Sequence, residues 1–222
     1  MLMRSMKTNQ SRCRDRASGF SLLEMMTVVA ISLILTVVSV VSLVPVMKQY
    51  RVTNAYNTTL SALRQARDNA VSQRTSYQVT FSSTASPNTI TVTPTLTTFS
   101  GAQSTATYQL PSDISFITQT QFASATPPDS FGAGTVAIDF GYTANGGTGG
   151  SNTFYFCPDG SAQSTTCGSG GYANNWDGGV VYLSRSGDLM SSRAITLWGA
   201  TGRIHGWRFY NATGGGYQWV RQ

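Results

Sequence analysis

Gly19-Phe20-Ser21-Leu22-Leu23-Glu24 opens the stretch that decides the fold, an apolar run that continues to Met47. Between Phe20 and Met47, Glu24 is the only charged residue. A helix that crosses the hydrocarbon core of a bilayer needs about 20 apolar residues, so this run is long enough to span a membrane. We therefore predict a transmembrane helix over about residues 20–47.

The residues before this run are strongly basic. Five cations and one acid precede Gly19: Arg4, Lys7, Arg12, Arg14, Arg16 and Asp15. Lys and Arg that gather on one side of a membrane span keep that side in the cytoplasm. The N-terminus should therefore be cytoplasmic, and the rest of the chain should lie across the membrane.

The order of residues around Gly19 resembles the processing site of type IV prepilins, a family that includes the pseudopilins of type II secretion. A basic leader, a glycine, an aromatic, a hydroxyl residue, a glutamate and an apolar helix follow one another here. The resemblance implies that prepilin peptidase cleaves between Gly19 and Phe20, that Phe20 is then N-methylated, and that Glu24 acts in assembly. It covers only the N-terminal part of the chain.

Glu24 has a physical reason to find a partner. A carboxylate at the centre of a spanning helix is disfavoured by roughly 2.5–3.5 kcal/mol. Cleavage after Gly19 would expose an α-amino group on Phe20 with a pKa of about 7.7–8.0, which is largely cationic at neutral pH. We expect Glu24 of one subunit to pair with the terminal ammonium of the next and to fix the axial register. The alternative is an interfacial acid that reaches toward the lipid head groups.

An ordinary secretory signal or an uncleaved membrane anchor is the competing interpretation of this N-terminus. A secretory signal places a small-residue cleavage site after an apolar core of about 7–15 residues. Here the apolar run is longer, the glycine precedes it, and no clear Ala-x-Ala site follows it. These features favour the prepilin interpretation.

The composition leaves room for one soluble domain beyond the helix. The chain has 222 residues, with fifteen Lys and Arg and nine Asp and Glu. Loss of a leader over residues 1–19 removes five cations and one acid, so the remainder carries a net charge of only +2. No global basic field remains to attract nucleic acid. We predict a cleaved leader over 1–19, a long helix over 20–72 and a soluble β-rich domain over 73–222.

The helix is expected to continue past the membrane. Pro45 removes a backbone donor, so a kink or local unwinding is predicted there. Beyond it, apolar residues recur at helical spacing: Val52, Ala55, Tyr56, Leu60, Leu63, Ala66 and Ala70. This apolar stripe should pack on the soluble domain. The polar face is basic (Lys48, Arg51, Arg64, Arg67 and Arg74) and is interpreted as solvated or as a contact between subunits.

From residue 75 onward the pattern alternates between apolar and polar residues, which indicates strands. Strands are predicted over 76–81, 88–93, 105–110, 113–119, 134–140, 152–156, 179–184, 193–199, 203–210 and 216–221. Short strands separated by turns favour antiparallel sheets packed around the second half of the helix. The predicted fold class is therefore α+β, pilin-like, with a long N-terminal helix on a C-terminal antiparallel β domain and no second helix.

The sequence gives little support for metal, cofactor or catalytic chemistry. Cys157 and Cys167 are ten residues apart and are expected to form a disulfide on the exported side of the membrane, whereas Cys13 leaves with the leader. Two cysteines and His205 do not make a zinc pattern. Asp177 with Asn174 and Asn175 offers too few acids for calcium. No catalytic motif is present, so we predict a non-enzyme without a cofactor.

The C-terminal segment is the most distinctive part of the soluble domain. A Ser-Gly-Asp turn at 186–188, an apolar strand and a Gly202-Arg203-Ile204 strand resemble the GspH/FimT group of minor pilins and pseudopilins. Some FimT-like members bind DNA through Gly-Arg-x-Arg, but here His205 stands in the place of the second arginine, and His is mostly uncharged at neutral pH. Candidate DNA-binding residues are Arg203, His205, Trp207 and Arg208. The alternative, that these residues pack along a strand, is favoured.

Three functions stay open at this stage. The first is a minor pilin or pseudopilin that assembles into a type II secretion pseudopilus or a type IV pilus, with the tip as one position. The second is a FimT-like DNA-binding minor pilin that acts in DNA uptake. The third is a membrane-tethered β domain unrelated to filaments. The expected partners are other pilin subunits and prepilin peptidase, and the expected location is the bacterial inner membrane before assembly and a periplasmic or extracellular filament afterwards.

Overall fold

Residues 19–95, 105–142, 149–167, 178–212 and 214–222 are described by the computed structural model. The chain divides after Pro45 into two units, residues 1–45 and 46–222. One long helix, α1 (Leu22–Gln73), has residues in both units. Asn174, Asn175 and Asp177, which were considered above as calcium ligands, lie outside the described residues.

The first part of α1, from Leu22 to Pro45, is apolar and exposed along its whole length. Its Leu, Ile, Val and Met side chains are 47–78% exposed. The helix continues through Pro45. Of the two alternatives predicted there, a kink or local unwinding, the unwinding is wrong, because the loss of one backbone donor does not end the helix.

The second part of α1 buries one face within the 46–222 unit. Its buried residues follow helical spacing: Val52, Ala55, Tyr56, Thr59, Leu60, Ala62, Leu63, Ala66 and Ala70. Four of these residues are alanines, whose small side chains let neighbouring strands approach the helix closely. The predicted amphipathic stripe is confirmed.

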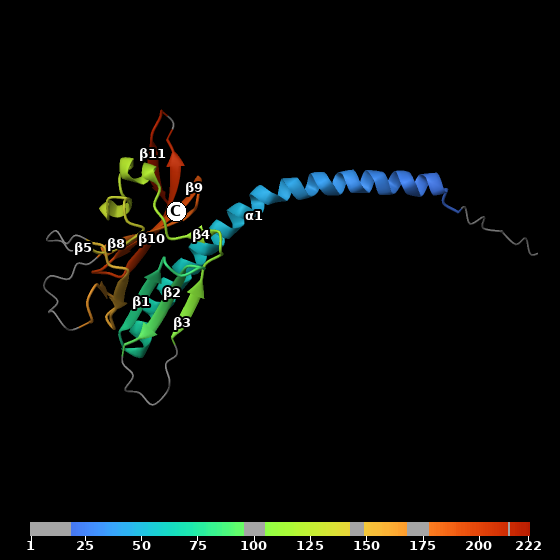
Figure 1. Ribbon diagram of the computed structural model, residues 1–222. Coiled ribbons are helices and arrows are strands. Elements are labelled where there is room, and N and C mark those ends of the chain that lie inside the picture. The colour runs from blue at the N-terminus through green and yellow to red at the C-terminus, as the bar shows by residue number, and fades with distance from the viewer. Residues whose placement is uncertain (1–18, 96–104, 143–148, 168–177, 213) are drawn as a thin grey trace, which may run out of the picture. The chain divides into compact units, whose positions relative to one another are not determined.

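Two antiparallel sheets make up the rest of this unit (Figure 1). The first has the order β3-β2-β1-β6-β7, with β1 (Tyr77–Ser82), β2 (Thr89–Pro94), β3 (Ala106–Gln109), β6 (Thr153–Phe156) and β7 (Ala162–Gln163). In β1 and β2 every second residue is buried, which explains the alternation in their sequences.

The second sheet has the order β11-β10-β9-β8-β4, and β5 also pairs with β8. Its strands are β4 (Ile114–Ser115), β5 (Ile138–Tyr142), β8 (Gly178–Arg185), β9 (Asp188–Trp198), β10 (Arg203–Asn211) and β11 (Tyr217–Arg221). Seven consecutive residues of β8 and seven of β9 are buried. These two strands therefore form the centre of the sheet and are covered on both faces.

Several elements of the structure differ from those predicted. The strand predicted over 113–119 is only Ile114–Ser115, because its register pairs it only with the end of β8 at Ser184 and Arg185. The strand predicted over 134–140 begins later, at Ile138. Two short 3-10 helices, η1 (Thr120–Ser124) and η2 (Pro128–Ser130), occupy a segment for which no helix was predicted.

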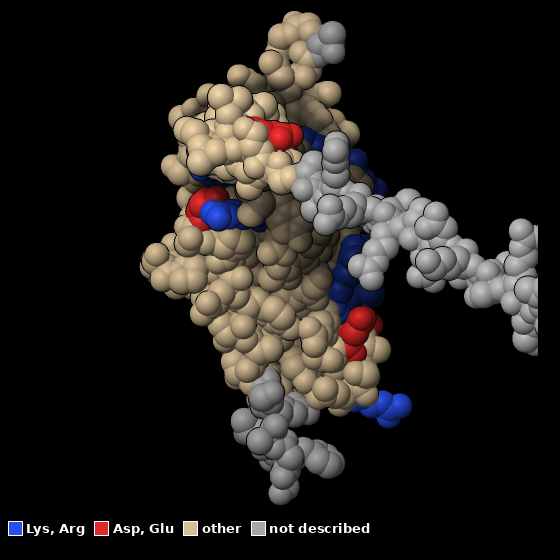
Figure 2. Space-filling view, turned by 90° about the vertical axis from the view of Figure 1, so that its right-hand side faces the viewer, with Lys and Arg blue, Asp and Glu red and all other residues tan. Residues whose placement is uncertain are grey.

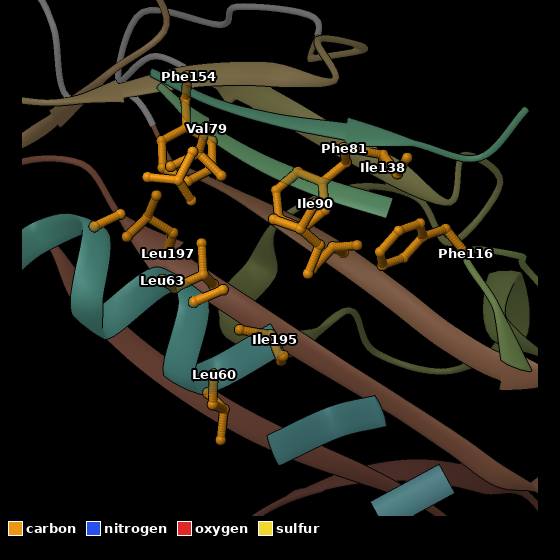
Figure 3. Packing of buried hydrophobic residues seen from close by; sticks show 14 of the residues in the cluster. Leu60, Leu63, Val79, Phe81, Ile90, Phe116, Ile138, Phe154, Ile195 and Leu197 are labelled. Atoms are coloured by element: carbon orange, nitrogen blue, oxygen red, sulfur yellow. The ribbon is translucent and has the colours of Figure 1, made fainter. Parts of the chain in front are cut away.

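The main hydrophobic core lies where α1 meets both sheets. Figure 3 shows Leu60 and Leu63 of the helix in one cluster with Val79 of β1 and with Ile195 and Leu197 of β9. Phe81 packs in the same cluster with Phe116, Phe140 and Phe154 at ring distances of 5.4, 5.4 and 6.2 Å. Full burial of each large apolar side chain stabilises the fold by about 1.5–3 kcal/mol. The predicted arrangement of sheets around the helix is confirmed.

A second, smaller core covers part of the second sheet. It contains Phe122 of η1 with Tyr182 of β8, Phe209 of β10 and Trp219 of β11. The ring of Phe122 lies 5.1 Å from those of Phe209 and Trp219. The segment that includes η1 is therefore held against the sheet by aromatic packing.

Candidate functional site

The N-terminal candidate residues lie directly before and within the first turn of α1. Gly19 and Phe20 precede the helix, and the amide of Met25 donates to the carbonyl of Ser21 at 3.1 Å. Glu24 lies in the first turn, where a negative charge interacts favourably with the helix dipole. Phe20 is 74% exposed and Glu24 is exposed, so both are accessible to other molecules.

The apolar part of α1 satisfies its own polar groups. Among the residues that the structure describes, α1 is the one helix long and apolar enough to cross a membrane. The hydroxyls of Ser32, Thr36 and Ser39 each donate to the backbone carbonyl four residues earlier, at 2.7–2.8 Å. In hydrocarbon an unsatisfied polar group costs several kcal/mol, so these internal bonds suit a helix surrounded by lipid or by other apolar helices.

The two remaining cysteines form the predicted disulfide. Cys157 and Cys167 are bonded, with their Cα atoms 5.7 Å apart. Within the loop that the bond closes, the amide of Gly160 donates to the carbonyl of Cys157 at 2.9 Å. The carbonyl of Gly160 in turn accepts a hydrogen bond from Nε of Arg67 at 3.1 Å. The disulfide loop is thus joined to the polar face of α1.

Two of the four candidate DNA-binding residues are held inside the domain. His205 is opposite Thr196 in the β9–β10 ladder, and its Nδ1 donates to Oδ2 of Asp129 at 2.9 Å. Nε1 of Trp207 donates to Oγ1 of Thr196 at 3.1 Å, and that hydroxyl donates to the same Asp129 oxygen. His205 and Trp207 therefore belong to one partly buried network that connects both strands to η2.

Asp129 is the acceptor at the centre of this network. Burial alone would raise the pKa of its carboxyl, but hydrogen bonds from Thr196, His205 and Trp198 outweigh burial, and the net pKa is lowered. The carboxylate is therefore ionised at neutral pH, which makes His205 Nδ1 the donor. Asp129 also has a backbone φ of 50°, in the left-handed region that Asp and Asn tolerate better than most residues.

Arg208 lies on the other face of β10 from His205 and Trp207, because successive side chains of a strand alternate. Its guanidinium carbon is 4.9 Å from the centre of the Tyr210 ring. Directly opposite in the ladder is Arg193, which is 4% exposed and donates to the carbonyls of Ser191 and Ser192. Burial and the nearby Arg208 charge lower the pKa of the Arg193 guanidinium.

Arg203 is the one exposed residue among the four candidates, and it lines a pocket that it shares with His205 but not with Trp207 or Arg208. It lines an open cavity of about 430 Å³ at the junction of α1, the turn before β10, and β11. Three further arginines line the same cavity, Arg64 and Arg67 from α1 and Arg221 from β11, together with Asp68. The structure therefore separates Arg203 from Trp207 and Arg208 and brings it beside helix arginines instead.

Lys and Arg side chains are unevenly distributed over the surface (Figure 2). In Figure 2, Lys and Arg side chains gather along one side of the visible face, with Asp or Glu side chains beside them. Among the described residues, no group of three or more His, Cys, Asp and Glu is arranged to hold a metal ion.

Neither the pocket nor the role of Asp129 is predicted by the sequence. Arg64 and Arg67 were placed on a basic helix face, but nothing in their spacing indicates that Arg203 and Arg221 lie beside them. Asp129 belongs to no motif in the sequence. Its preceding prolines, Pro127 and Pro128, signal a turn, but no local pattern connects that turn to His205.

Comparison with known proteins gives one match. Residues 14–40 match the family model described as the prokaryotic N-terminal methylation motif. Neither the curated proteins nor the solved structures contain a match to the chain. The matched residues include Gly19, Phe20, Glu24 and the beginning of the exposed apolar helix. The chain therefore carries the N-terminal methylation motif of type IV pilins and pseudopilins, and this motif supports its membership of that family.

Proposed function

We propose that the chain is a minor pilin or pseudopilin subunit that assembles into a type II secretion pseudopilus or a type IV pilus. In this proposal prepilin peptidase removes residues 1–19, Phe20 becomes N-methylated, and the 73–222 domain faces away from the cytoplasm. The subunit is held in the inner membrane by residues 20–47 before it joins the filament. A position at the tip agrees with the GspH/FimT resemblance of the C-terminal strands.

The observation that best supports this proposal is that the methylation motif overlaps an apolar helix whose side chains are exposed. The motif spans residues 14–40, and within it the helix side chains from Leu22 onward are exposed. So large an apolar surface is unfavourable in water and has to be covered by lipid or by the helices of other subunits. A filament subunit needs both environments, first the membrane and then a bundle of helices.

Mass spectrometry of the protein extracted from membranes tests the proposed processing. The expected mature N-terminus is Phe20 with one added methyl group, and residues 1–19 are absent. A Gly19→Val variant should keep its leader, because the peptidase requires the glycine before the cut in the family that this site resembles. An intact leader in the unaltered protein, or a cut at another bond, contradicts the proposal.

We do not extend the proposal to DNA uptake. Of the four candidate residues, His205 and Trp207 are engaged with Asp129 and Thr196, and Arg208 packs over Tyr210. Trp219, an aromatic side chain of β11, is 9% exposed and belongs to the second core. Only Arg203 remains available, and its neighbours in the pocket favour a different ligand.

A further inference from the structure

The pocket at Arg203 combines a high positive charge with a concave shape. Arg64, Arg67, Arg203 and Arg221 line it with one acid, Asp68. Among the residues that the structure describes, none of these four arginines forms a salt bridge within 4.0 Å. Charges of one sign that line a hollow surface focus the electrostatic field and attract an oppositely charged group. The pocket therefore carries a net positive charge.

One of these arginines is already fixed in position. Arg67 donates from Nε to the carbonyl of Gly160 at 3.1 Å and from Nη2 to the carbonyl of Thr201 at 3.0 Å. The next residue, Gly202, leaves no space for a side chain, since a Cβ atom there would lie 2.1 Å from the Gly160 oxygen and 2.8 Å from Arg67 Nε. The guanidinium is therefore held by the turn and by the disulfide loop, while its Nη1 hydrogens stay available to a ligand. Donors fixed in advance lose less entropy when a ligand binds.

The lining of the pocket favours carboxylates over nucleic acid. Proteins that bind single-stranded nucleic acid combine positive charge with aromatic side chains on which bases stack. Among the described residues, no Phe, Tyr or Trp lines this pocket, and the one aromatic ring in its lining, the His205 imidazole, is bonded to Asp129. Arginine forks match carboxylates geometrically and hold them through paired hydrogen bonds. The small volume fits a few side chains of a peptide rather than a polynucleotide.

We propose that this pocket binds the carboxylate side chains of an acidic segment on a partner subunit of the filament. This inference rests on the proposed function, which places other subunits beside the domain. After loss of the leader the chain carries a net charge of +2, so an acidic partner is complementary to the domain as well as to the pocket. Arg64, Arg203 and Arg221 are exposed and supply the contacts, while Arg67 sets the floor of the site.

Binding of labelled peptides to the full chain in a nonionic detergent tests this inference. The probes are a fluorescein-labelled hexaglutamate, the matching hexaglutamine, and a labelled single-stranded DNA hexamer, followed by fluorescence anisotropy. Hexaglutamate should bind and hexaglutamine should not. Arg203→Gln and Arg64→Gln should each weaken hexaglutamate binding by about tenfold, the usual size of one lost charge-assisted hydrogen bond. Asp68→Asn should strengthen it, because the variant removes a like charge from the site.

Arg74→Gln is the matched control, because Arg74 is an exposed arginine just past the end of α1 that does not line the pocket. This variant should bind hexaglutamate as the unaltered chain does. The inference is overturned if Arg74→Gln weakens hexaglutamate binding as much as Arg203→Gln does, or if the unaltered chain does not bind hexaglutamate. It is also overturned if the chain binds the DNA hexamer more tightly than hexaglutamate and Arg203→Gln removes that binding. A chain that is processed at Gly19 but does not bind hexaglutamate overturns this inference alone. A chain that binds hexaglutamate but keeps its leader overturns the proposed function and, with it, the identity of the partner.

Discussion

Asp129 shows how a single carboxylate connects three elements of the domain. It accepts hydrogen bonds from Thr196 of β9 and His205 of β10 while lying in η2 itself. Alternation along β10 predicts that His205 and Trp207 share a face, but it does not predict the acid that they meet. Contacts between residues 67 or more positions apart depend on the tertiary fold, so no local sequence pattern contains them.

The pH dependence of stability should report on Asp129. Its pKa is lower in the folded protein than the value of about 3.9 expected for an unfolded chain. The stabilisation from the ionised carboxylate is therefore complete above about pH 4 and is lost as the pH falls through the lower, folded pKa. We expect Asp129→Asn to reduce the free energy of unfolding by about 1–3 kcal/mol at neutral pH. Below about pH 4, the free energy of unfolding of the variant should fall less steeply with decreasing pH than that of the unaltered chain.

Urea unfolding of the full chain in detergent, followed by tryptophan fluorescence at several pH values, measures this effect. Asn tolerates the left-handed backbone of residue 129, so the substitution isolates the loss of charge. Asp159→Asn is the control, because the Asp159 carboxylate is exposed and bonds only to nearby Ser161 among the described residues. An unchanged stability of Asp129→Asn at neutral pH would contradict the role assigned to the network.

Gly206 explains another feature that the sequence does not reveal. A Cβ atom at this position would lie 1.5 Å from the hydroxyl oxygen of Tyr56. The glycine is therefore required by the close approach of β10 to α1 and not by an unusual backbone angle. The sequence of the Gly202–Arg208 segment suggests a ligand-binding motif. The structure shows that Gly206 in this segment serves packing, because it lets β10 lie close to Tyr56.

At the scale of elements, strands with strict alternation were predicted well and short or irregular ones were not. In β1 and β2 the alternating residues face one core, so burial and sequence pattern coincide. β7 has two residues and was missed, because a pair such as Ala162–Gln163 carries no period. The 3-10 helices were missed for a related reason, since aromatic packing of Phe122 against Phe209 and Trp219 fixes their position rather than local propensity.

The disulfide loop should stabilise the domain measurably. A bond between Cys157 and Cys167 closes a loop of ten residues, and loops of this size are stabilised by about 2–3 kcal/mol through the restricted unfolded chain. We expect the double variant Cys157→Ser, Cys167→Ser to lose about that free energy of unfolding in chemical denaturation. Cys13→Ser, which changes the one cysteine of the predicted leader, should have no effect. Equal stability of the double variant and the unaltered chain would show that the loop contributes nothing.

At the scale of the whole molecule, the sequence predicted the arrangement of sheets around a helix but not the basic pocket. Amphipathic spacing shows which face of α1 is buried, and alternation shows where strands occur. The pocket depends on which turn of the helix lies beside the start of β10, and this alignment is set by the packed core. Arg64 and Arg203 are 139 positions apart in the chain, so only the tertiary fold brings their charges to one site.

The assembly role that we propose for Glu24 depends on the neighbouring subunits of the proposed filament. In a bundle of apolar helices, a charge that loses its partner costs about 3–5 kcal/mol, so the Phe20 ammonium should depend on a neighbouring Glu24. We expect Glu24→Gln to insert into the membrane and to be processed normally, but to enter filaments at least about tenfold less often. Immunoblots of sheared filaments and of membranes measure the two pools. Ser32→Ala is the control, because the Ser32 hydroxyl bonds only within its own helix among the described residues. If Glu24→Gln entered filaments as often as the control does, the carboxylate would be an interfacial acid and register would have to come from elsewhere.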